Sequence, residues 1–528
     1  MTILHVLVTG ISLPVCCHLQ RYPHTCDAPS SSDTSRLLAV KSVRINSIAG
    51  LSYIAWKCTS LVVSCPPSNA SLQPNTIHSQ WIAHPHISVV CPASSDANTA
   101  LDRGSHDSKF EIDNPRVELW SSLNGSMGRF SIAKQCIRIG EQAIEAAAFA
   151  VVVRQSLTHR RCHWCFALLR TKALQCGDCA FTRYCSRDCL VTDAPLHEFQ
   201  CKALRDLQHF GCDGGGVGDV ETLRLALAVL SMEHFVQNSQ ALRLLCTHAE
   251  GGDDTSEVQK AVEFIIKKTN HGVDRKHVLT TLQRVRCNAH PIYLDGVTCV
   301  GSGVFPEAAM ALNHSCLPNV VPSFNSRTRT LAFHAIADIP RGYAIECAYI
   351  DVLQARKRRQ ELLDRGFGFT CVCKRCTREA ALHTMRHDKA AESEEANVEE
   401  ETQVMKELMQ LVNSGCSSAQ QRLACLTKEY ASLFKHNSEA QFALYTTEMQ
   451  LARDRDDWNR VMETAEILLK IWSRCGLPDN YHTTETLHVQ IYYAAKNAGM
   501  MSKAKTAAKR VASIRQICGY SHSETVIE

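Results

Sequence analysis

The sequence predicts an α+β fold in which short β-strands are split by a cysteine-rich zinc-binding module and a helical insert. A second cysteine-rich segment and an all-α C-terminal part follow. Three observations predict this arrangement. Seven cysteines and two histidines lie within residues 162–201, between stretches that favour short strands. Apolar residues then recur with helical spacing over 203–285. After about residue 402 the helical pattern returns and continues to the C-terminus.

The composition limits the class of protein. A chain of 528 residues is long enough for roughly two to four domains, and its net charge of +4 is too small to indicate a nucleic-acid or membrane surface. The 27 cysteines fit either secreted disulfides or intracellular metal sites, and their spacing decides. The apolar N-terminus lacks the Lys/Arg start of a signal peptide, and no later segment approaches the ~20 apolar residues of a spanning helix. We therefore expect a cytoplasmic and nuclear protein with reduced thiols and no membrane association.

The chain divides into segments of different character. Residues 1–115 are rich in Ser, Pro, His and Cys without a sustained period, which predicts a low-order extension of unknown role. The acidic stretch 388–401 is typical of a solvated linker or of the exposed start of a helix. The other predicted segments are strands at 116–161, the cysteine cluster at 162–201, helices at 202–285, strands at 286–351, a cysteine-rich segment at 352–378, an acidic linker at 379–401 and helices at 402–528.

The C-terminal helical region contains a weak internal repeat. The stretches DWNRVMETAEILLKIWSRCG and MSKAKTAAKRVASIRQICG each carry an apolar stripe at helical spacing and end at a glycine. Helix pairs repeated at this scale resemble tetratricopeptide hairpins, which stack and bury each other's apolar faces. An unrelated helical bundle explains the pattern equally well, so both readings stay open here.

The first cysteine cluster has the spacing C-x2-C-x10-C-x2-C-x5-C-x3-C-x7-H-x3-C. Eight Cys and His donors suit two zinc ions, because tetrahedral Zn²⁺ takes four of them. The spacing resembles the MYND zinc finger, in which the two sites interleave. The resemblance assigns Cys162, Cys165, Cys185 and Cys189 to one zinc, and Cys176, Cys179, His197 and Cys201 to the other. We expect His163, between two ligands, to be exposed rather than metal-bound. The finger serves either as a structural brace or as a binding site for a protein or proline-containing peptide.

The second cluster lacks one ligand of a zinc site. The stretch CVCKRC supplies Cys371, Cys373 and Cys376, and the isolated Cys316 lies some fifty-five residues earlier. Together they make one four-cysteine site that would hold a C-terminal flap against the loop of Asn313 and His314. The sequence therefore predicts three zinc ions.

These motifs together resemble the SET-and-MYND family of protein lysine methyltransferases. NHSCLPN at 313–319 matches the SET motif, ECAYID the tyrosine-bearing strand, and GFGFTCVCKRC the post-SET flap. GSMGRFSIA resembles the glycine-containing start of a SET domain. The resemblance implies a SET fold made of residues 116–161 and 286–351, split by the MYND finger and a helical SET insert, with a post-SET flap at 352–378.

The resemblance also implies a binding site for the methyl donor S-adenosylmethionine. Gly128 would allow close backbone approach, and Arg129 would pair with the cofactor carboxylate. Asn288, Asn313 and the backbone near His314 would hydrogen-bond the amino-acid part and the adenine.

Aromatic residues would form the channel for the acceptor lysine. Phe369 would stack near the adenine and line the channel together with Phe367, and Tyr349 would place its hydroxyl beside the transferred methyl. We expect Tyr349 to orient the amine rather than to take its proton. The substrate would be a protein lysine, on a histone or a non-histone protein, and the enzyme a monomer.

Three positions depart from the family pattern. Phe367 stands where tyrosine is usual, Met127 where lysine is common, and Phe130 where glycine is usual after Arg129. The alternative function is therefore a catalytically weak or inactive adaptor that recruits partners through the finger and the helical tail. DNA binding is poorly supported, because no dense basic stripe accompanies the cysteine cluster.

Overall fold

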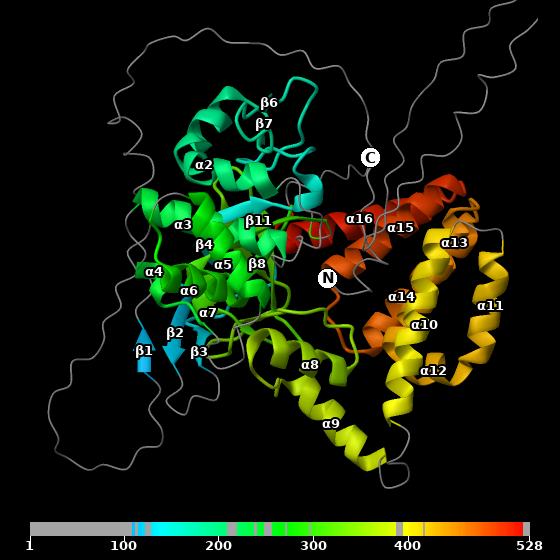
Figure 1. Cartoon of the computed structure of the whole chain (residues 1–528). Helices are drawn as coiled ribbons and strands as arrows, with labels where there is room; N and C mark the ends of the chain where they lie inside the picture. Colours follow the sequence, from blue (N-terminus) through cyan, green and yellow to red (C-terminus); the bar gives the residue numbers. More distant parts are fainter. Residues whose placement is uncertain are drawn as a thin grey trace, which may run out of the picture.

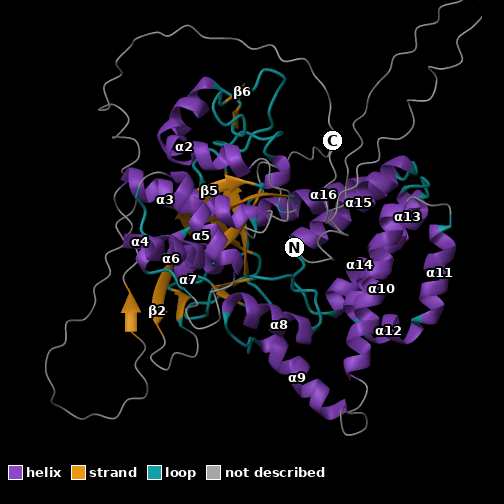
Figure 2. Cartoon of the chain, viewed as in Figure 1, coloured by secondary structure: helices purple, strands orange, loops and turns teal. Residues whose placement is uncertain are grey.

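The computed structural model describes residues 108–110, 114–121, 128–207, 219–236, 240–247, 256–269, 272–294, 296, 298–386, 394–414 and 418–520. Of the predicted extension at 1–115, residues 1–107 and 111–113 lie outside the described residues, as does Met127. The strands and the helices of residues 187–311 make up one half of the molecule in Figure 1, and the helices of residues 394–518 the other. Figure 2 shows the strands gathered among the first group of helices.

Strands from before the cysteine cluster pair with strands from after it. β4 (Gln142–Ala147) is antiparallel to β12 (Thr330–Ala335), which also pairs with β11 (Val320–Asn325). β5 (Ala150–Val153) pairs with β9 (Cys299–Val304), whose other edge takes β8 (Ala289–Tyr293). The cluster and the helices that follow it are therefore an insertion within one folded unit.

The remaining strands are short. A third antiparallel sheet contains β1 (Ser108–Phe110), β2 (Val117–Ser121) and β3 (Arg129–Ala133). β6 (Leu174–Gln175) pairs with β7 (Arg183–Tyr184) inside the cysteine cluster. β10 (Asn313–His314) lies parallel to β13 (Glu346–Cys347), which brings two distant predicted motifs side by side.

Six helices accompany these strands within the described residues: α2 (Arg187–Leu207), α3 (Val220–Val236), α4 (Gln240–Arg243), α5 (Ser256–Thr269), α6 (Arg275–Asn288) and α7 (Pro306–Ala311). The sequence places the end of this helical segment at 285, whereas α6 continues to Asn288. Helix α3 is buried from Leu223 to Met232, so its stretch LRLALAVL reads as apolar on all sides rather than as one stripe. Its one buried cation, Arg224, donates from Nη1 to Val153 O at 2.8 Å.

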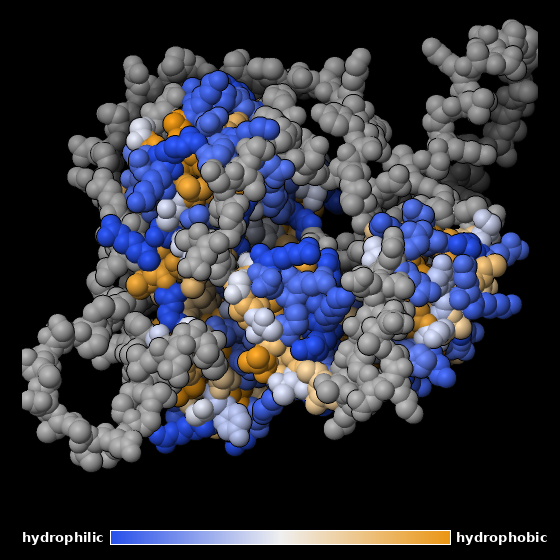
Figure 3. Space-filling model, turned by 60° about the horizontal axis from the view of Figure 1, so that its bottom comes forward, coloured by the Kyte–Doolittle hydropathy of each residue, from blue (hydrophilic) through white to orange (hydrophobic). Residues whose placement is uncertain are grey.

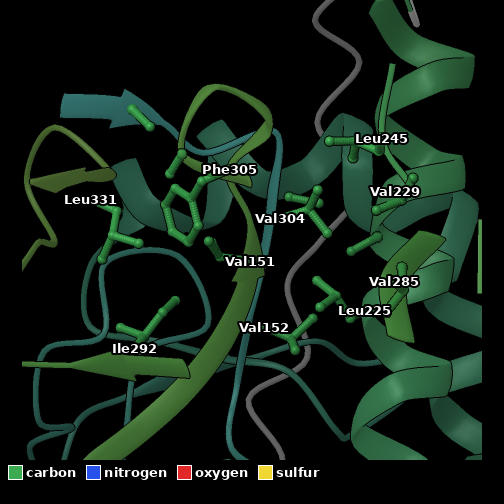
Figure 4. Packing of buried hydrophobic residues seen from close by; sticks show 14 of the residues in the cluster. Val151, Val152, Leu225, Val229, Leu245, Val285, Ile292, Val304, Phe305 and Leu331 are labelled. Carbon is green, nitrogen blue, oxygen red and sulfur yellow. The ribbon is translucent and has the colours of Figure 1, made fainter. Parts of the chain in front are cut away.

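The core lies between α3, α6 and the β5–β9 sheet. Figure 4 shows Val151 of β5 beside the ring of Phe305, which follows β9, and Val152 of β5 beside Leu225 of α3. All of these side chains are buried.

Glycines in β9 permit a close approach. A Cβ atom on Gly301 would overlap Val152 O and lie 2.7 Å from the Phe166 ring. Phe166 belongs to the cysteine cluster and is fully buried. The glycine therefore leaves room for an aromatic anchor that joins the cluster to the sheet.

Among the described residues, two helices follow the strands, and seven more form the C-terminal part. The first two are α8 (Arg356–Phe367) and α9 (Lys374–Arg386). The seven are α10 (Glu394–Ser414), α11 (Ala419–Glu429), α12 (Ala431–His436), α13 (Ser438–Arg453), α14 (Trp458–Arg474), α15 (His482–Asn497) and α16 (Met501–Cys518). Helix α10 begins at Glu394, so part of the predicted acidic linker at 379–401 is helical.

The predicted stripes of the tail are buried. Val461, Ala465, Leu468 and Trp472 of α14 lie in the core of this part, whereas Leu469 is only partly covered. The stripe of α16 is buried as well, and α13 to α16 pack each against the next. The helical C-terminal part is thus confirmed.

The end of α16 packs on the strand half. Gly519 ends the helix with a φ of +73°, and a Cβ atom there would overlap the ring of His334 on β12. Tyr520 is buried against Gly296, where a Cβ atom would overlap its ring. Two glycines thus allow the tail to meet the sheet.

The described residues on the face seen in Figure 3 are largely polar. On the face seen in Figure 3, apolar side chains form small patches separated by hydrophilic ones. Within the part of the chain that the structure describes, no helix combines the length and the apolar character needed to cross a bilayer.

We expect Gly519→Ala to loosen the junction between the tail and the sheet. The left-handed backbone costs alanine about 1–2 kcal/mol, and overlap with His334 adds about 1–3 kcal/mol. Gly499→Ala is the matched control, because Gly499 has a φ of +74° but open space around its Cβ position. Thermal unfolding should show a clearly larger fall in Tm for Gly519→Ala. Equal shifts would mean that the His334 contact does not matter.

Glu439→Gln tests a second contact between the halves. Glu439 of α13 is buried and accepts a hydrogen bond from Ala355 N at 2.8 Å, and burial raises its pKa to about 7 from 4.5. The unfolded carboxyl ionises near pH 4.5 and the folded one near 7, so the carboxylate destabilises the fold as pH rises through this window. The free energy of unfolding that the variant gains should increase from pH 5 to pH 8, by at most about 3 kcal/mol. Thermal unfolding at a series of pH values should show this as a growing increase in Tm. Glu463→Gln, at an exposed position of α14 where the carboxylate pairs with Arg460, is the control and should show no gain in Tm.

Candidate functional site

The structure brings the eight predicted ligands of residues 162–201 into two groups. One contains Cys162, Cys165, Cys185 and Cys189, and the other Cys176, Cys179, His197 and Cys201; the ligand atoms of each group lie within 4.8 Å of one another. Cys185 Sγ lies 3.4 Å from Cys165 Sγ and 3.6 Å from Cys189 Sγ, and Cys179 Sγ lies 3.6 Å from His197 Nε2. A tetrahedral zinc with bonds of about 2.3 Å separates its sulfurs by about 3.8 Å, so both donor sets fit the metal.

His163 differs from the prediction in one respect. It joins neither group, but it is not exposed, because the cluster turns this ring toward the sheet. Its Nδ1 accepts a hydrogen bond from Arg183 N at 3.1 Å, and the ring packs edge-on against Phe181. Burial holds the His163 pKa well below its ordinary range, so the ring is a neutral structural element.

The third predicted group also assembles. Cys316 Sγ lies 4.0 Å from Cys371 Sγ and 3.5 Å from Cys376 Sγ, and Cys373 completes the set within 4.8 Å. Cys316 follows β10, while the other three precede or begin α9. The group therefore ties the start of α9 to the loop after β10, and its four sulfurs fit zinc.

Arg359 of α8 lies against this group. Its side chain is fully buried; Nε donates to Cys316 Sγ at 3.2 Å, and Nη2 lies 3.6 Å from Cys376 Sγ. The same guanidinium pairs with Glu379. Four thiolates around Zn²⁺ carry a net charge of −2, so a buried guanidinium offsets part of that charge.

His314 lies between the third group and Tyr349. The parallel pairing of β10 with β13 sets His314 opposite Cys347, two residues before Tyr349. His314 Nδ1 accepts a hydrogen bond from Tyr349 N at 3.0 Å, and His314 Nε2 lies 3.3 Å from Cys316 Sγ. Burial lowers the His314 pKa to about 4, so the imidazole is neutral near pH 7.

Three aromatic rings pack around Tyr349. The Tyr349 ring centre lies 4.9 Å from that of Phe367, 5.5 Å from that of His314 and 6.5 Å from that of Phe369. The Tyr349 hydroxyl donates to Leu312 O, and burial raises the Tyr349 pKa well above its ordinary value. The hydroxyl therefore stays protonated, with its direction fixed by a main-chain carbonyl.

Two predicted cofactor residues share a neighbouring segment. Arg129 donates from Nη1 to Leu244 O, and its Nη2 lies 3.4 Å from Cys246 Sγ. Asn288, at the end of α6, donates from Nδ2 to Cys246 O and to Arg284 O, both at 2.8 Å. Both amide hydrogens of Asn288 are thus engaged, which leaves its Oδ1 as an acceptor.

The remaining predicted positions are neighbours in sequence of residues already described: Gly128 and Phe130 flank Arg129, and Asn313 precedes His314. Gly128 has a φ of +59° and open space at its Cβ position, which fits a turn where a ligand comes near. Phe130, where the family has glycine, stands on β3 opposite Trp120. Asn313 lies in β10 opposite Glu346.

A cavity of about 560 Å³ opens beside Tyr349. Asn288, Tyr349 and Phe367 line it from the strand half, and Phe442, Tyr481 and His482 line it from the helical tail. The space is large enough for an extended peptide segment, and the helical tail supplies one of its walls.

Several of these residues carry no signal in the sequence. Arg359 is one arginine in the run RKRR, and nothing in that run distinguishes the buried one. Leu244 and Cys246 follow α4 and belong to no motif. Tyr481 and His482 lie at the start of α15, and only the packing of the tail on the sheet turns them toward the cavity.

Comparison with known proteins agrees with the predicted resemblance. The MYND finger family matches residues 162–201. The chain is 26% identical over 262 residues to N-lysine methyltransferase SMYD2-A of Xenopus laevis, and 28% identical over 263 residues to N-lysine methyltransferase SMYD2 of Bos taurus. The Homo sapiens protein of the same name is 27% identical over 265 residues. Each match spans 47% of this chain and 58% of the relative. The predicted resemblance is thereby confirmed, including the MYND finger.

Cys316→Ser should remove one zinc ion from the protein. We expect three zinc ions per chain from the three groups, and two in the variant, because the remaining three cysteines of the third group cannot close a tetrahedral site. Elemental analysis of the purified protein measures this. Cys347→Ser is the control: Cys347 is also buried near β10 but belongs to none of the three groups, so it should keep three. Three zinc ions in Cys316→Ser would remove Cys316 from the ligand set.

Proposed function

We propose that this chain, a member of the SET and MYND domain-containing family, is a protein lysine N-methyltransferase that uses S-adenosylmethionine. The observation that carries the proposal is the set of rings around Tyr349. His314, Phe367 and Phe369 lie beside a phenol whose hydroxyl is held by Leu312 O, at the edge of the large cavity. Such an apolar space with one fixed polar group suits a lysine side chain and its amine.

The residues around this space fit the methyl donor. The free Oδ1 of Asn288 suits the cofactor's ammonium, and Arg129 offers a guanidinium for its carboxylate. Gly128 leaves space for close backbone approach. The bound donor would supply an electrophilic methyl group on a sulfonium.

The chain's own residues would then select and orient the acceptor. A lysine has a pKa of about 10.4 in water, so its amine must lose a proton before it attacks. An aromatic channel beside a cationic donor disfavours the ammonium form. Tyr349 stays protonated and therefore does not take the proton; its oxygen accepts from the amine and directs the lone pair. Phe367, in place of the family's tyrosine, removes one hydroxyl and widens the channel.

The cavity supports a protein rather than a small-molecule substrate. Its walls come from two parts of the chain that lie far apart in sequence, and it runs from the tyrosine to the helical tail. We propose protein lysines, on histones or non-histone proteins, as the acceptors, and proline-containing peptides as ligands of the finger. Cytoplasm and nucleus, which keep thiols reduced, suit the twelve metal-ligand positions.

Tyr349→Phe tests the proposed activity. We expect transfer of labelled methyl from S-adenosylmethionine to a lysine substrate to fall about 100-fold or more, because orientation of the amine is lost. Cofactor binding, measured by calorimetry, should persist, since the ring and its packing remain. Tyr343→Phe is the control, because Tyr343 is 57% exposed and lies outside the site.

Two results would contradict the proposal. If zinc-loaded protein neither binds the cofactor nor labels any lysine in a panel of histone and non-histone proteins, the adaptor function replaces it. If Tyr349→Phe methylates as fast as the native chain, another group orients the amine.

A further inference from the structure

We infer that His314 is a positioning residue that links the zinc thiolate of Cys316 to the main chain of Tyr349. The inference rests on the proposed function for its meaning in catalysis, but its geometry stands independently. One buried imidazole touches the third cysteine group with one nitrogen and the tyrosine segment with the other.

The hydrogen-bond directions fix the form of this ring. A backbone N–H can only donate, so His314 Nδ1, 3.0 Å from Tyr349 N, must present its lone pair. If Nδ1 carried a proton, this N–H and the Tyr349 N–H would face each other and neither could accept a hydrogen bond. The neutral ring therefore carries its proton on Nε2 and donates it to Cys316 Sγ at 3.3 Å.

The sulfur is the partner that this tautomer requires. A zinc-bound cysteine is a thiolate and a good acceptor, whereas a free thiol carries its own proton and accepts weakly. Cys316 Sγ also receives the Nε–H of Arg359 at 3.2 Å, so two N–H groups converge on it. Such contacts to a metal ligand commonly change metal affinity by about 10- to 100-fold when removed.

The other end of the link bears on the tyrosine. Tyr349 is held at two points, its N–H by His314 Nδ1 and its hydroxyl by Leu312 O, and both partners belong to one short stretch, 312–314. A change at Cys316 thus reaches Tyr349 through the ring of His314, in addition to the packing of Tyr349 against the third group.

Two variants separate the ends of the link. His314→Asn places an amide oxygen near the Nδ1 position, so it keeps an acceptor for Tyr349 N–H and loses the contact with Cys316. His314→Gln reaches the Nε2 position, so it keeps a donor for the sulfur and loses the contact with Tyr349. His488→Asn, a partly buried histidine of α15 outside the metal groups, controls for the substitution itself.

The first readout is zinc release to a chromogenic chelator, followed on the full chain. The phase belonging to the third site is the one missing from Cys316→Ser. We expect this phase to be about 10-fold faster in His314→Asn and near the native rate in His314→Gln and His488→Asn. Equal rates in the two His314 variants would overturn the thiolate contact.

The second readout is the tautomer itself. Long-range proton–nitrogen NMR of histidine-labelled, zinc-loaded protein should show His314 protonated at Nε2, with its signal assigned by its loss in the variants. Protonation at Nδ1 would overturn the inference.

The third readout is methyl transfer. His314→Gln should lower kcat and leave the cofactor KM unchanged, and an unchanged kcat would remove the link to Tyr349. If no preparation methylates, the proposed function fails, while zinc release and the tautomer still decide the link.

Discussion

The closure of one four-cysteine group across a long stretch of chain is the constraint on which the candidate site depends. Cys316 comes from the loop after β10, and its three partners come from the start of α9. Bringing four thiols and the buried Arg359 together without a metal would leave polar and charged groups poorly compensated. Zinc in this site would supply the missing free energy and turn the sulfurs into acceptors. The same closure fixes Phe367 and Phe369 beside Tyr349, because Phe367 ends α8 and Phe369 lies between α8 and Cys371.

The finger and the tail are built into the strand half rather than appended to it. Phe166 of the finger fills space left by Gly301, and Arg329, in the turn after β11, lies 3.8 Å above the ring of Trp164. Such cation–π contacts hold the finger to the sheet by about 1 kcal/mol each, in addition to burial of the rings. The tail in turn closes the cavity with Tyr481 and its neighbours. The finger braces the sheet whatever else it binds.

The sequence was most informative about the metal ligands, because metal coordination dictates their spacing. It was least informative where tertiary packing decides which residue of a segment is buried. All three metal groups could be predicted, since thiolate and imidazole ligands must occur in sets of four. The rings of Tyr349, Phe367 and Phe369 lie together because they accompany those ligands in the chain. Arg359 could not be predicted, because only tertiary packing selects one arginine from a basic run. The exposure expected of His163 was wrong for the same reason: no local pattern shows that the finger folds back onto the sheet.

The central claim is that one zinc-closed pocket holds the methyl donor. Calorimetric titration of the full chain with S-adenosylmethionine, with and without an intact third site, tests it most directly. The account predicts binding of one cofactor per zinc-loaded chain and a loss of at least tenfold in affinity in Cys316→Ser, while Cys347→Ser binds as the native chain does. No binding to the zinc-loaded protein, or equal affinity in Cys316→Ser, would contradict it.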